Sequence, residues 1–143
     1  ENEKPVADNC YFNISHAGDY VVGVSSDCEV GCDIEKIVDA PLEIADCFFN
    51  SPEAEYIAAS QDKNRAFFKL WTLKESYMKM TGKGFSIPPE MIGFTLDEKG
   101  KIQSEKEGVF RQYLLTEGVI SVCIKENAET ADHFKVRKVE WES

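Results

Sequence analysis

Long hydrophobic runs are absent from the sequence. A helix that crosses a bilayer needs about 18 or more apolar residues in a row, whereas even the stretches around Phe48 and Leu70 are broken by charges within a few positions. We therefore expect no membrane span. The length allows no second domain either, because 143 residues, 43% of them hydrophobic and 29% charged, are typical of one domain around one core.

Motifs of paired cysteines are absent as well. The 5 cysteines form an odd set without a CxxC pair, so we expect neither a disulfide framework nor a zinc knuckle, but reduced thiols in a cytoplasmic protein. There is no initiator Met and no apolar leader at Glu1. The sequence therefore shows no targeting signal, and we expect a trimmed or partial chain.

Positive charge is scarce overall. The 16 Lys and Arg residues against 26 Asp and Glu residues give a formal net charge of -10, which argues against general nucleic-acid binding, where a basic face is the rule. The balance is reversed between Lys63 and Lys83, where six bases stand against the acid Glu75. Such a segment suits a phosphorylated small molecule or an acidic partner. Alternatively, these bases only solvate a helix.

Short strands are expected near the N-terminus, after a polar and turn-like stretch over residues 1–15. The composition predicts strands over 20–25 and 29–37. A turn at Ser26 and Asp27 would join these two strands as a hairpin.

Helices are expected in the middle of the chain. The spacing over 41–49 is compatible with a helix, and the run 51–53 (Ser-Pro-Glu) is typical of a helix start, which predicts a second helix ending near Ser60. The longest periodic segment, 62–81, is predicted as a helix that Gly82 ends.

The helix over 62–81 has two distinct faces at about 100° per residue. The apolar stripe consists of Ala66, Leu70, Leu73, Tyr77 and Met80. The opposite face carries Phe68, Trp71, Glu75 and Lys79, with Glu75 near its centre.

The second half of the chain is predicted to be mostly antiparallel sheet. Strands are expected over 91–96, 101–105, 109–116, 119–125 and 134–141. Helices followed by a run of strands predict an α+β domain and not a doubly wound parallel sheet.

Two carboxylates are predicted to share one face of the strand over 29–37. Strand side chains alternate, so Asp33 and Glu35 point to one side and Ile34 to the other. Two carboxylates so placed repel unless a cation lies between them, and their hard oxygens favour magnesium or manganese over zinc. An exposed acidic edge strand would show the same pattern, so this segment alone leaves both interpretations open.

Two further segments carry candidate functional groups. Trp71, Glu75 and Lys79 are spaced by four and stack along one helix face; a surface Glu-Lys pair beside a partly buried Trp is the alternative. Ser15 and His16 precede the first predicted strand, where a hydroxyl, an imidazole and turn amides can hold a phosphate. A surface His in a turn is the alternative there.

Taken together and in order, three blocks resemble the signature of the 4'-phosphopantetheinyl transferases of the Sfp type. The blocks are Asn-Ile-Ser-His at 13–16, Val-Gly-Cys-Asp-Ile-Glu at 30–35 and Trp-Thr-Leu-Lys-Glu-Ser-Tyr-Met-Lys at 71–79. Phe48-Phe49 followed by Glu53, and the run Thr81-Gly82-Lys83-Gly84, are also similar to that family. Cys32 stands where the family usually has an aliphatic residue, a tolerable exchange for a buried thiol.

The resemblance implies a magnesium-dependent transferase. Such an enzyme moves the phosphopantetheine arm of coenzyme A to a serine of an apo acyl, aryl or peptidyl carrier protein, as a holo-acyl-carrier-protein synthase does, and releases adenosine 3',5'-bisphosphate. By the same resemblance, three carboxylates hold the Mg²⁺ ion, namely Asp33, Glu35 and Glu75. Glu75 also serves as the base for the serine hydroxyl or holds the water that does.

The resemblance also places residues around the coenzyme. Lys79 and Lys74 would lie at the diphosphate, Lys79 as a catalytic residue as well. Ser15 and His16 would lie near a coenzyme A phosphate. Two further residues are placed by the same carry-over: Lys4 near the adenine end and Glu53 near the reacting centre.

The resemblance covers nearly the whole chain but only about the latter two-thirds of the family. In that family two similar α+β halves pack about a pseudo-twofold axis. Residues 1–37 would be the end of the first half and residues 38–143 the second half. Three explanations stay open: an incomplete sequence, a separate N-terminal partner chain, or self-association of the short chain. A noncatalytic module that binds coenzyme A and magnesium is the alternative function. Carrier proteins tend to be acidic, so the segment 63–83 is the candidate docking surface.

Overall fold

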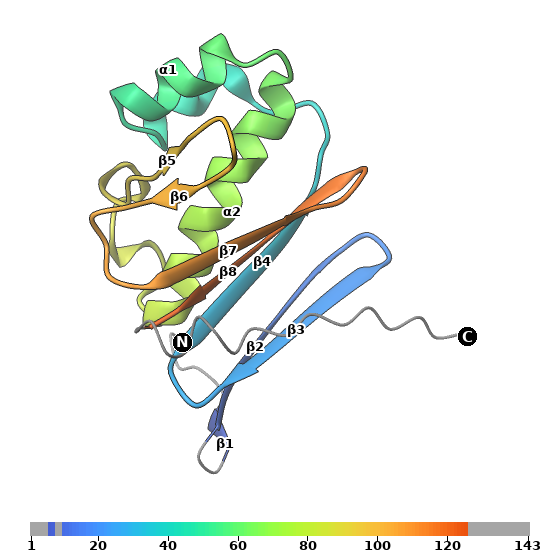
Figure 1. The fold of residues 1–143 in the computed structure, drawn as a ribbon, viewed down its shortest axis with the longest axis vertical. Helices are drawn as coiled ribbons and strands as arrows, with labels where there is room; N and C mark the ends of the chain where they lie inside the picture. The colour runs from blue at the N-terminus through green and yellow to red at the C-terminus, as the bar shows by residue number, and fades with distance from the viewer. Residues whose placement is uncertain (1–5, 8–9, 126–143) are drawn as a thin grey trace.

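The computed structural model describes residues 6–7 and 10–125. The strand predicted over 134–141, and Lys4, lie outside the described residues. Within the described part, the chain forms an α+β fold in which one long helix packs on a three-stranded antiparallel sheet, as predicted (Figure 1). None of the described helices is long and apolar enough to cross a membrane.

The central sheet has the strand order β4-β8-β7. It consists of β4 (Val30–Lys36), β8 (Gly118–Ile124) and β7 (Val109–Leu114). β4 pairs antiparallel with β8, and this register sets Asp33 opposite Ser121. One long edge of β4 is therefore hydrogen-bonded to β8, and the N-terminal strands lie at its other edge.

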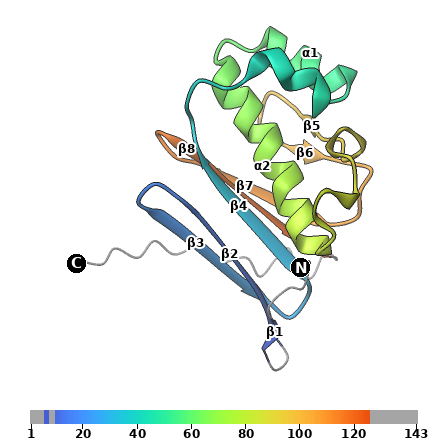
Figure 2. The same ribbon diagram turned by 180° about the vertical axis from the view of Figure 1, so that it is seen from behind.

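A separate N-terminal sheet lies beside β4. It has the order β1-β2-β3, with β1 (Val6–Ala7), β2 (Cys10–Ala17) and β3 (Tyr20–Ser26), and Figure 2 shows it on the side of β4 away from α1. The turn-like prediction for residues 1–15 is therefore wrong at 10–15, and so is the hairpin predicted at Ser26 and Asp27. β3 pairs with β2, because Gly18 takes a left-handed φ of 58° that suits the tight turn between them.

The long helix α2 (Lys63–Thr81) confirms the prediction for this segment. Asp62 caps its N-terminus by accepting a hydrogen bond from the Arg65 N–H, and Gly82 ends it with a left-handed φ of 73°. The predicted stripe is buried apart from the half-buried Tyr77. Phe68, predicted on the opposite face, is buried too, because other elements cover α2 on more than one side.

A polar seam joins α2 to the central sheet. The hydroxyls of Thr72 and Ser121 are 2.7 Å apart, and the side-chain amide of Gln112 donates to Ser121 Oγ at 2.9 Å. Thr72 and Ser121 are both fully buried. Because these groups satisfy one another, polar atoms can lie under the helix without an unpaired donor at this point.

Shorter elements cover the other sides of α2. The 3₁₀ helix η1 (Leu42–Cys47) and the helix α1 (Ser51–Ala59) occupy the segments predicted as helices, but the N-cap of α1 is Asn50 and not Ser51. Asn50 and Glu53 form a capping box. The strands predicted over 91–96 and 101–105 are shorter than expected. The elements that follow α2 are η2 (Gly84–Ser86), η3 (Pro89–Met91), β5 (Thr95–Leu96) and β6 (Ile102–Gln103).

Candidate functional site

The face of β4 that packs against α2 carries the two carboxylates of the strand. At Gly31 a Cβ atom would overlap the backbone of α2 at Ser76 and Met80, so this side of the strand faces the helix. Side chains two residues apart share a face, which places Asp33 and Glu35 on the same side. The site is therefore built between β4 and α2.

Asp33 is the most constrained group of the site. Its side chain is 6% exposed, and its Oδ1 accepts hydrogen bonds from the Ser15 hydroxyl at 3.3 Å and from the Lys79 ammonium at 3.2 Å. Its Oδ2 is buried and has no hydrogen-bond partner within the described part of the chain. A buried acceptor without a partner is costly, so this oxygen is suited to a ligand.

Two carboxyls of the site, Asp33 and Glu75, have pKa values raised by burial and by neighbouring charges. Burial raises the pKa of Asp33 to about 8; the charges of Glu35 and Glu75 add to the rise, and Lys79 opposes it. Burial also raises the pKa of Glu75, with Lys79 lowering it and Glu35 raising it further. Asp33, Glu35 and Glu75 therefore lie close enough to repel, with the Lys79 ammonium as a common counter-charge.

The residues present fit a hard divalent cation. All the candidate ligands are carboxylate oxygens, which Mg²⁺ prefers, and one oxygen of Asp33 is buried without a partner. Among the described residues, no three or more His, Cys, Asp or Glu side chains are arranged to hold a metal ion as they stand. The carboxylates thus have the chemistry of a cation site, and their side chains must move to close around the ion.

The raised pKa of Asp33 predicts that the metal-free chain loses stability as the pH rises. The folded-state pKa of about 8 lies above the usual aspartate pKa of 3.8, so between these two pH values the folded chain binds a proton that the unfolded chain has released. The contribution of Asp33 to the free energy of unfolding is then highest below pH 4. It declines as the pH rises to 8, by at most about 1.4 kcal/mol per pH unit. Urea unfolding in the presence of EDTA at pH 5, 6, 7 and 8 measures the decline.

Asp33→Asn is the control for this titration. An amide cannot ionise, so the variant should show a flatter profile over the same range. If the free energy of unfolding depends on pH in the same way in the wild type and in Asp33→Asn, the assignment of the titration to Asp33 is wrong.

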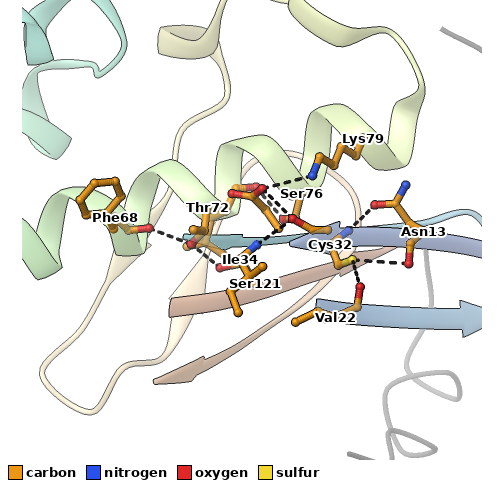
Figure 3. Close-up of polar contacts among 12 residues, drawn as sticks. Asn13, Val22, Cys32, Ile34, Phe68, Thr72, Ser76, Lys79 and Ser121 are labelled. Carbon is orange, nitrogen blue, oxygen red and sulfur yellow. Dashed lines mark hydrogen bonds and ion pairs between the residues drawn. The ribbon is translucent and has the colours of Figure 1, made fainter. Parts of the chain in front are cut away.

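The N-terminal strand β2 supports the site through its side chains. Asn13 Oδ1 accepts a hydrogen bond from the Cys32 N–H at 3.0 Å, and Ser15 Oγ accepts one from the Ile34 N–H at 3.2 Å (Figure 3). These are backbone donors on the edge of β4 that β8 does not use. Ser15 thus holds both the backbone of β4 and the Asp33 carboxylate.

The part that Asn13 and Ser15 play was not predicted. Ser15 was expected at a coenzyme phosphate, yet its hydroxyl is buried and engaged with Asp33. Polar residues at alternate positions, 13 and 15, are the signal in the sequence that would have placed these side chains on one face of a strand. His16 is exposed on the opposite face, where it is accessible to a ligand.

Lys74 and Glu53 lie away from the carboxylates, in the core between α1 and α2. Lys74 Nζ donates to Glu53 Oε1 at 2.7 Å, and both side chains are 0% exposed. The resemblance placed Lys74 at the coenzyme diphosphate. The structure contradicts this expectation, because the buried Lys74 side chain cannot touch a coenzyme. The two residues are partners of each other.

The predicted basic surface over 63–83 is not continuous. Lys74 is buried, Lys79 is paired with Asp33, and Arg65 donates to the Thr116 carbonyl at 2.9 Å. Lys63 and Lys83 remain exposed. The basic side chains of this segment therefore contact different partners and do not form one docking surface.

An aromatic pair lies one helical turn from the carboxylates. Trp71 precedes Glu75 by four residues on α2, and its ring lies 5.1 Å from that of Phe48, tilted by 58°. Both side chains are half-buried against the main core. One face of α2 thus carries an ammonium, a carboxylate and an aromatic ring in successive turns.

The chain has relatives among known proteins. Residues 29–132 match the family model of the 4'-phosphopantetheinyl transferase superfamily. The chain is 36% identical over 103 residues to the 4'-phosphopantetheinyl transferase Sfp of Bacillus subtilis, which covers 71% of this chain and 46% of the relative. It is 34% identical over 146 residues to the 4'-phosphopantetheinyl transferase psf-1 of Bacillus pumilus, covering 94% of this chain and 62% of the relative. The chain thus spans between about half and two-thirds of the length of these relatives.

The fold has a counterpart among solved structures. The holo-[acyl-carrier-protein] synthase of Neisseria meningitidis superposes with a TM-score of 0.61 at 15% identity, over 69% of this chain and 98% of that one. At this identity the likeness concerns the fold alone. Nearly the whole of that smaller chain is matched by the α+β arrangement described here.

Proposed function

The chain belongs to the 4'-phosphopantetheinyl transferase superfamily, and from this premise we propose that it transfers the 4'-phosphopantetheine group of coenzyme A to a serine of an apo carrier protein. The single observation that carries the proposal is the buried Asp33 carboxylate: one oxygen is paired to Lys79, and the other has no hydrogen-bond partner in the described part of the chain. A carboxylate in this state, beside Glu35 and Glu75, is prepared for a divalent cation and the phosphates that come with it.

The proposed reaction is a phosphoryl transfer. The serine oxygen forms a bond to the β-phosphorus of coenzyme A, and the bond from that phosphorus to the oxygen shared with the α-phosphate breaks. The electron pair leaves with adenosine 3',5'-bisphosphate, and the serine proton passes to Glu75 or to a water that Glu75 holds. Such a base must lie within hydrogen-bond reach of the serine hydroxyl or of the water between them.

We propose that Asp33, Glu35 and Glu75 hold the Mg²⁺ ion of this reaction. When bound, the ion neutralises charge on the diphosphate, which is the main requirement of phosphoryl transfer. Lys79 then provides a second positive charge for the phosphate oxygens. Ser15 fixes the Asp33 carboxylate by its hydrogen bond, and the exposed His16 beside it is proposed to contact a coenzyme phosphate.

We propose that residues outside this chain complete the coenzyme site. The chain spans 46% of one relative and 62% of another, and the N-terminal hairpin exposes Ile14 by 59% and Val21 by 55%. Exposed apolar residues on one sheet suit a protein contact. A second copy of the chain or a separate N-terminal chain would supply it. Residues 1–37 and 38–143 remain our proposed division between the two halves of the family fold.

The intact mass of a carrier protein tests the transferase. An apo acyl or peptidyl carrier protein incubated with the chain, coenzyme A and Mg²⁺ should gain one phosphopantetheine. Glu75→Gln should slow this gain by about 100-fold or more, since it removes a group that acts on the reacting atoms. Glu55→Gln, an exposed position on α1, is the matched control and should retain the wild-type rate.

The other outcomes separate the alternatives. Binding of coenzyme A without any mass gain would favour the noncatalytic module. A rate that rises with the square of the chain concentration would indicate that two copies form the site. A rate that stays unchanged in EDTA would contradict the metal-dependent proposal. The carrier that is modified fastest, acyl or peptidyl, would identify the holo-acyl-carrier-protein synthase activity or exclude it.

A further inference from the structure

Lys79 reaches from α2 into the carboxylate site. Its Nζ lies 3.2 Å from Asp33 Oδ1, and its side chain is 31% exposed while that of Asp33 is 6% exposed. The Lys79 side chain is thus partly in contact with solvent. Its ammonium meets one oxygen of Asp33, whereas Oδ2 of the same carboxylate has no hydrogen-bond partner among the residues that the structure describes.

The same ammonium is the positive charge that Asp33 and Glu75 share. Lys79 acts electrostatically on both of these carboxyls, and Glu35 repels both. In the described part of the chain, no set of three ligand side chains is arranged around a point where an ion would lie. The ammonium of Lys79 acts on two of the three carboxyls, and it is within hydrogen-bond distance of Asp33.

We infer that Lys79 takes the place of the divalent cation in the metal-free chain, and that it must leave Asp33 before the cation binds. This inference rests on the metal site of the proposed function. An ammonium group and a divalent cation within a few ångströms of each other repel strongly in a partly buried site. Both cannot share Asp33, whereas the flexible, half-exposed stem of Lys79 allows its ammonium to swing toward solvent.

The exchange couples the metal to the phosphate ligand. When the cation takes the carboxylates, the hydrogen bond from the Lys79 ammonium to Asp33 is broken, and the ammonium can donate to a phosphate oxygen in its place. A ligand phosphate that holds Lys79 away from Asp33 in turn favours the cation, because such coupling is reciprocal. Lys79 therefore competes with the metal when the coenzyme is absent and cooperates with it when the coenzyme is bound.

Removing a residue from a metal site usually weakens metal binding, whereas this inference predicts that removing Lys79 strengthens it. Lys79→Met should tighten the binding of Mn²⁺ alone, by about 10-fold, because the competing charge is gone. A proton competes with the cation for Asp33 in the wild type as well as in this variant. A divalent cation still gains more than a proton from the loss of one nearby positive charge, because it carries twice the charge.

Electron paramagnetic resonance of free Mn²⁺, titrated against the chain without coenzyme, measures the affinity. Lys79→Arg keeps the charge and should bind Mn²⁺ as the wild type does. Lys83→Met removes one charge from an exposed position four residues away and corrects for the change in net charge. Circular dichroism confirms the fold of each variant, and Lys79→Gln replaces Lys79→Met if the latter does not fold.

Each outcome decides between the two proposals. Tighter Mn²⁺ binding in Lys79→Met but not in Lys83→Met supports the exchange. Equal or weaker binding in Lys79→Met, in a wild type that does bind Mn²⁺, overturns the exchange and leaves the proposed function standing. If neither the wild type nor any Lys79 variant binds Mn²⁺ at millimolar concentration, the metal site fails, and both proposals fail with it.

Discussion

Replacing Lys74 with methionine is expected to lower the free energy of unfolding by about 3–5 kcal/mol, because it leaves the Glu53 carboxylate buried without its counter-charge. Both side chains are 0% exposed, and their charged atoms are 2.7 Å apart. Methionine has nearly the length of the lysine stem, so the loss measures the charge and its hydrogen bonds more than the volume. Urea unfolding followed by circular dichroism gives the value.

The network around Lys74 explains why the loss should be large. Its ammonium has three protons, and three acceptors take them: Glu53 Oε1 at 2.7 Å, the Pro89 carbonyl at 2.9 Å and the Ile92 carbonyl at 2.7 Å. Glu53 Oε2 in turn accepts the Phe94 N–H at 2.7 Å. Removing the ammonium takes one donor from each of these acceptors. Glu53 Oε1 and the Pro89 carbonyl each keep a backbone donor, from Asn50 and Ile92, so the unbalanced charge of Glu53 is the main cost.

Two further variants separate the ion pair from other effects. Lys69→Met is a matched control on the same helix, where the half-exposed side chain should make the loss small. The double variant Lys74→Met with Glu53→Gln removes the stranded charge and should recover part of the stability. A loss below about 1 kcal/mol in Lys74→Met would contradict the role assigned to the pair.

This pair shows where prediction from the sequence stops. The resemblance placed Lys74 at the coenzyme and Glu53 near the reacting centre, whereas in the structure the two side chains form an ion pair with each other. Lys74 and Glu75 are adjacent in sequence, yet consecutive helix residues point about 100° apart. One enters the core and the other faces β4. Which of the two faces a core cannot be read from the sequence until the elements that cover the helix are known.

Local patterns were sufficient for other parts of the fold. The helix α2 carries its own start and stop signals in Asp62 and Gly82, so its bounds were predicted to within a residue. The alternation of Asp33 and Glu35 placed two carboxylates on one face, and the structure shows that this face packs on α2. Both predictions depend on residues close together in the sequence.

Long-range pairing could not be predicted in the same way. β4 pairs with β8, so that Asp33 lies opposite Ser121, a residue far away in the sequence. No local signal in the sequence specifies that partner. The expected hairpin between β3 and β4 was the choice that local turn residues favoured. β2 instead takes β3 as its partner and supports β4 by the side chains of Asn13 and Ser15.

Gly31 determines how closely α2 approaches β4. A Cβ atom at this position would overlap the Ser76 carbonyl oxygen and the Met80 backbone nitrogen. Both are backbone atoms inside a helix, which no side-chain rotation can move aside. The closeness matters for the site, because Glu75 and Lys79 belong to the same turns of α2 and face the carboxylates of β4.

Gly31→Ala should therefore destabilise the chain by about 3 kcal/mol or more, the upper range for overpacking a core, since α2 must shift away from β4. The same shift separates Glu75 from Asp33, so Mn²⁺ binding should weaken in the molecules that remain folded, which a loss of stability alone does not predict. Gly23→Ala is the matched control: nothing lies within 4 Å of a Cβ there, and its stability should be unchanged or slightly higher. Equal stability of the two variants would show that the helix can yield at Gly31. In that case the close contact would not be what holds Glu75 and Lys79 against the strand, and the polar seam from Thr72 to Ser121 would have to position the helix instead.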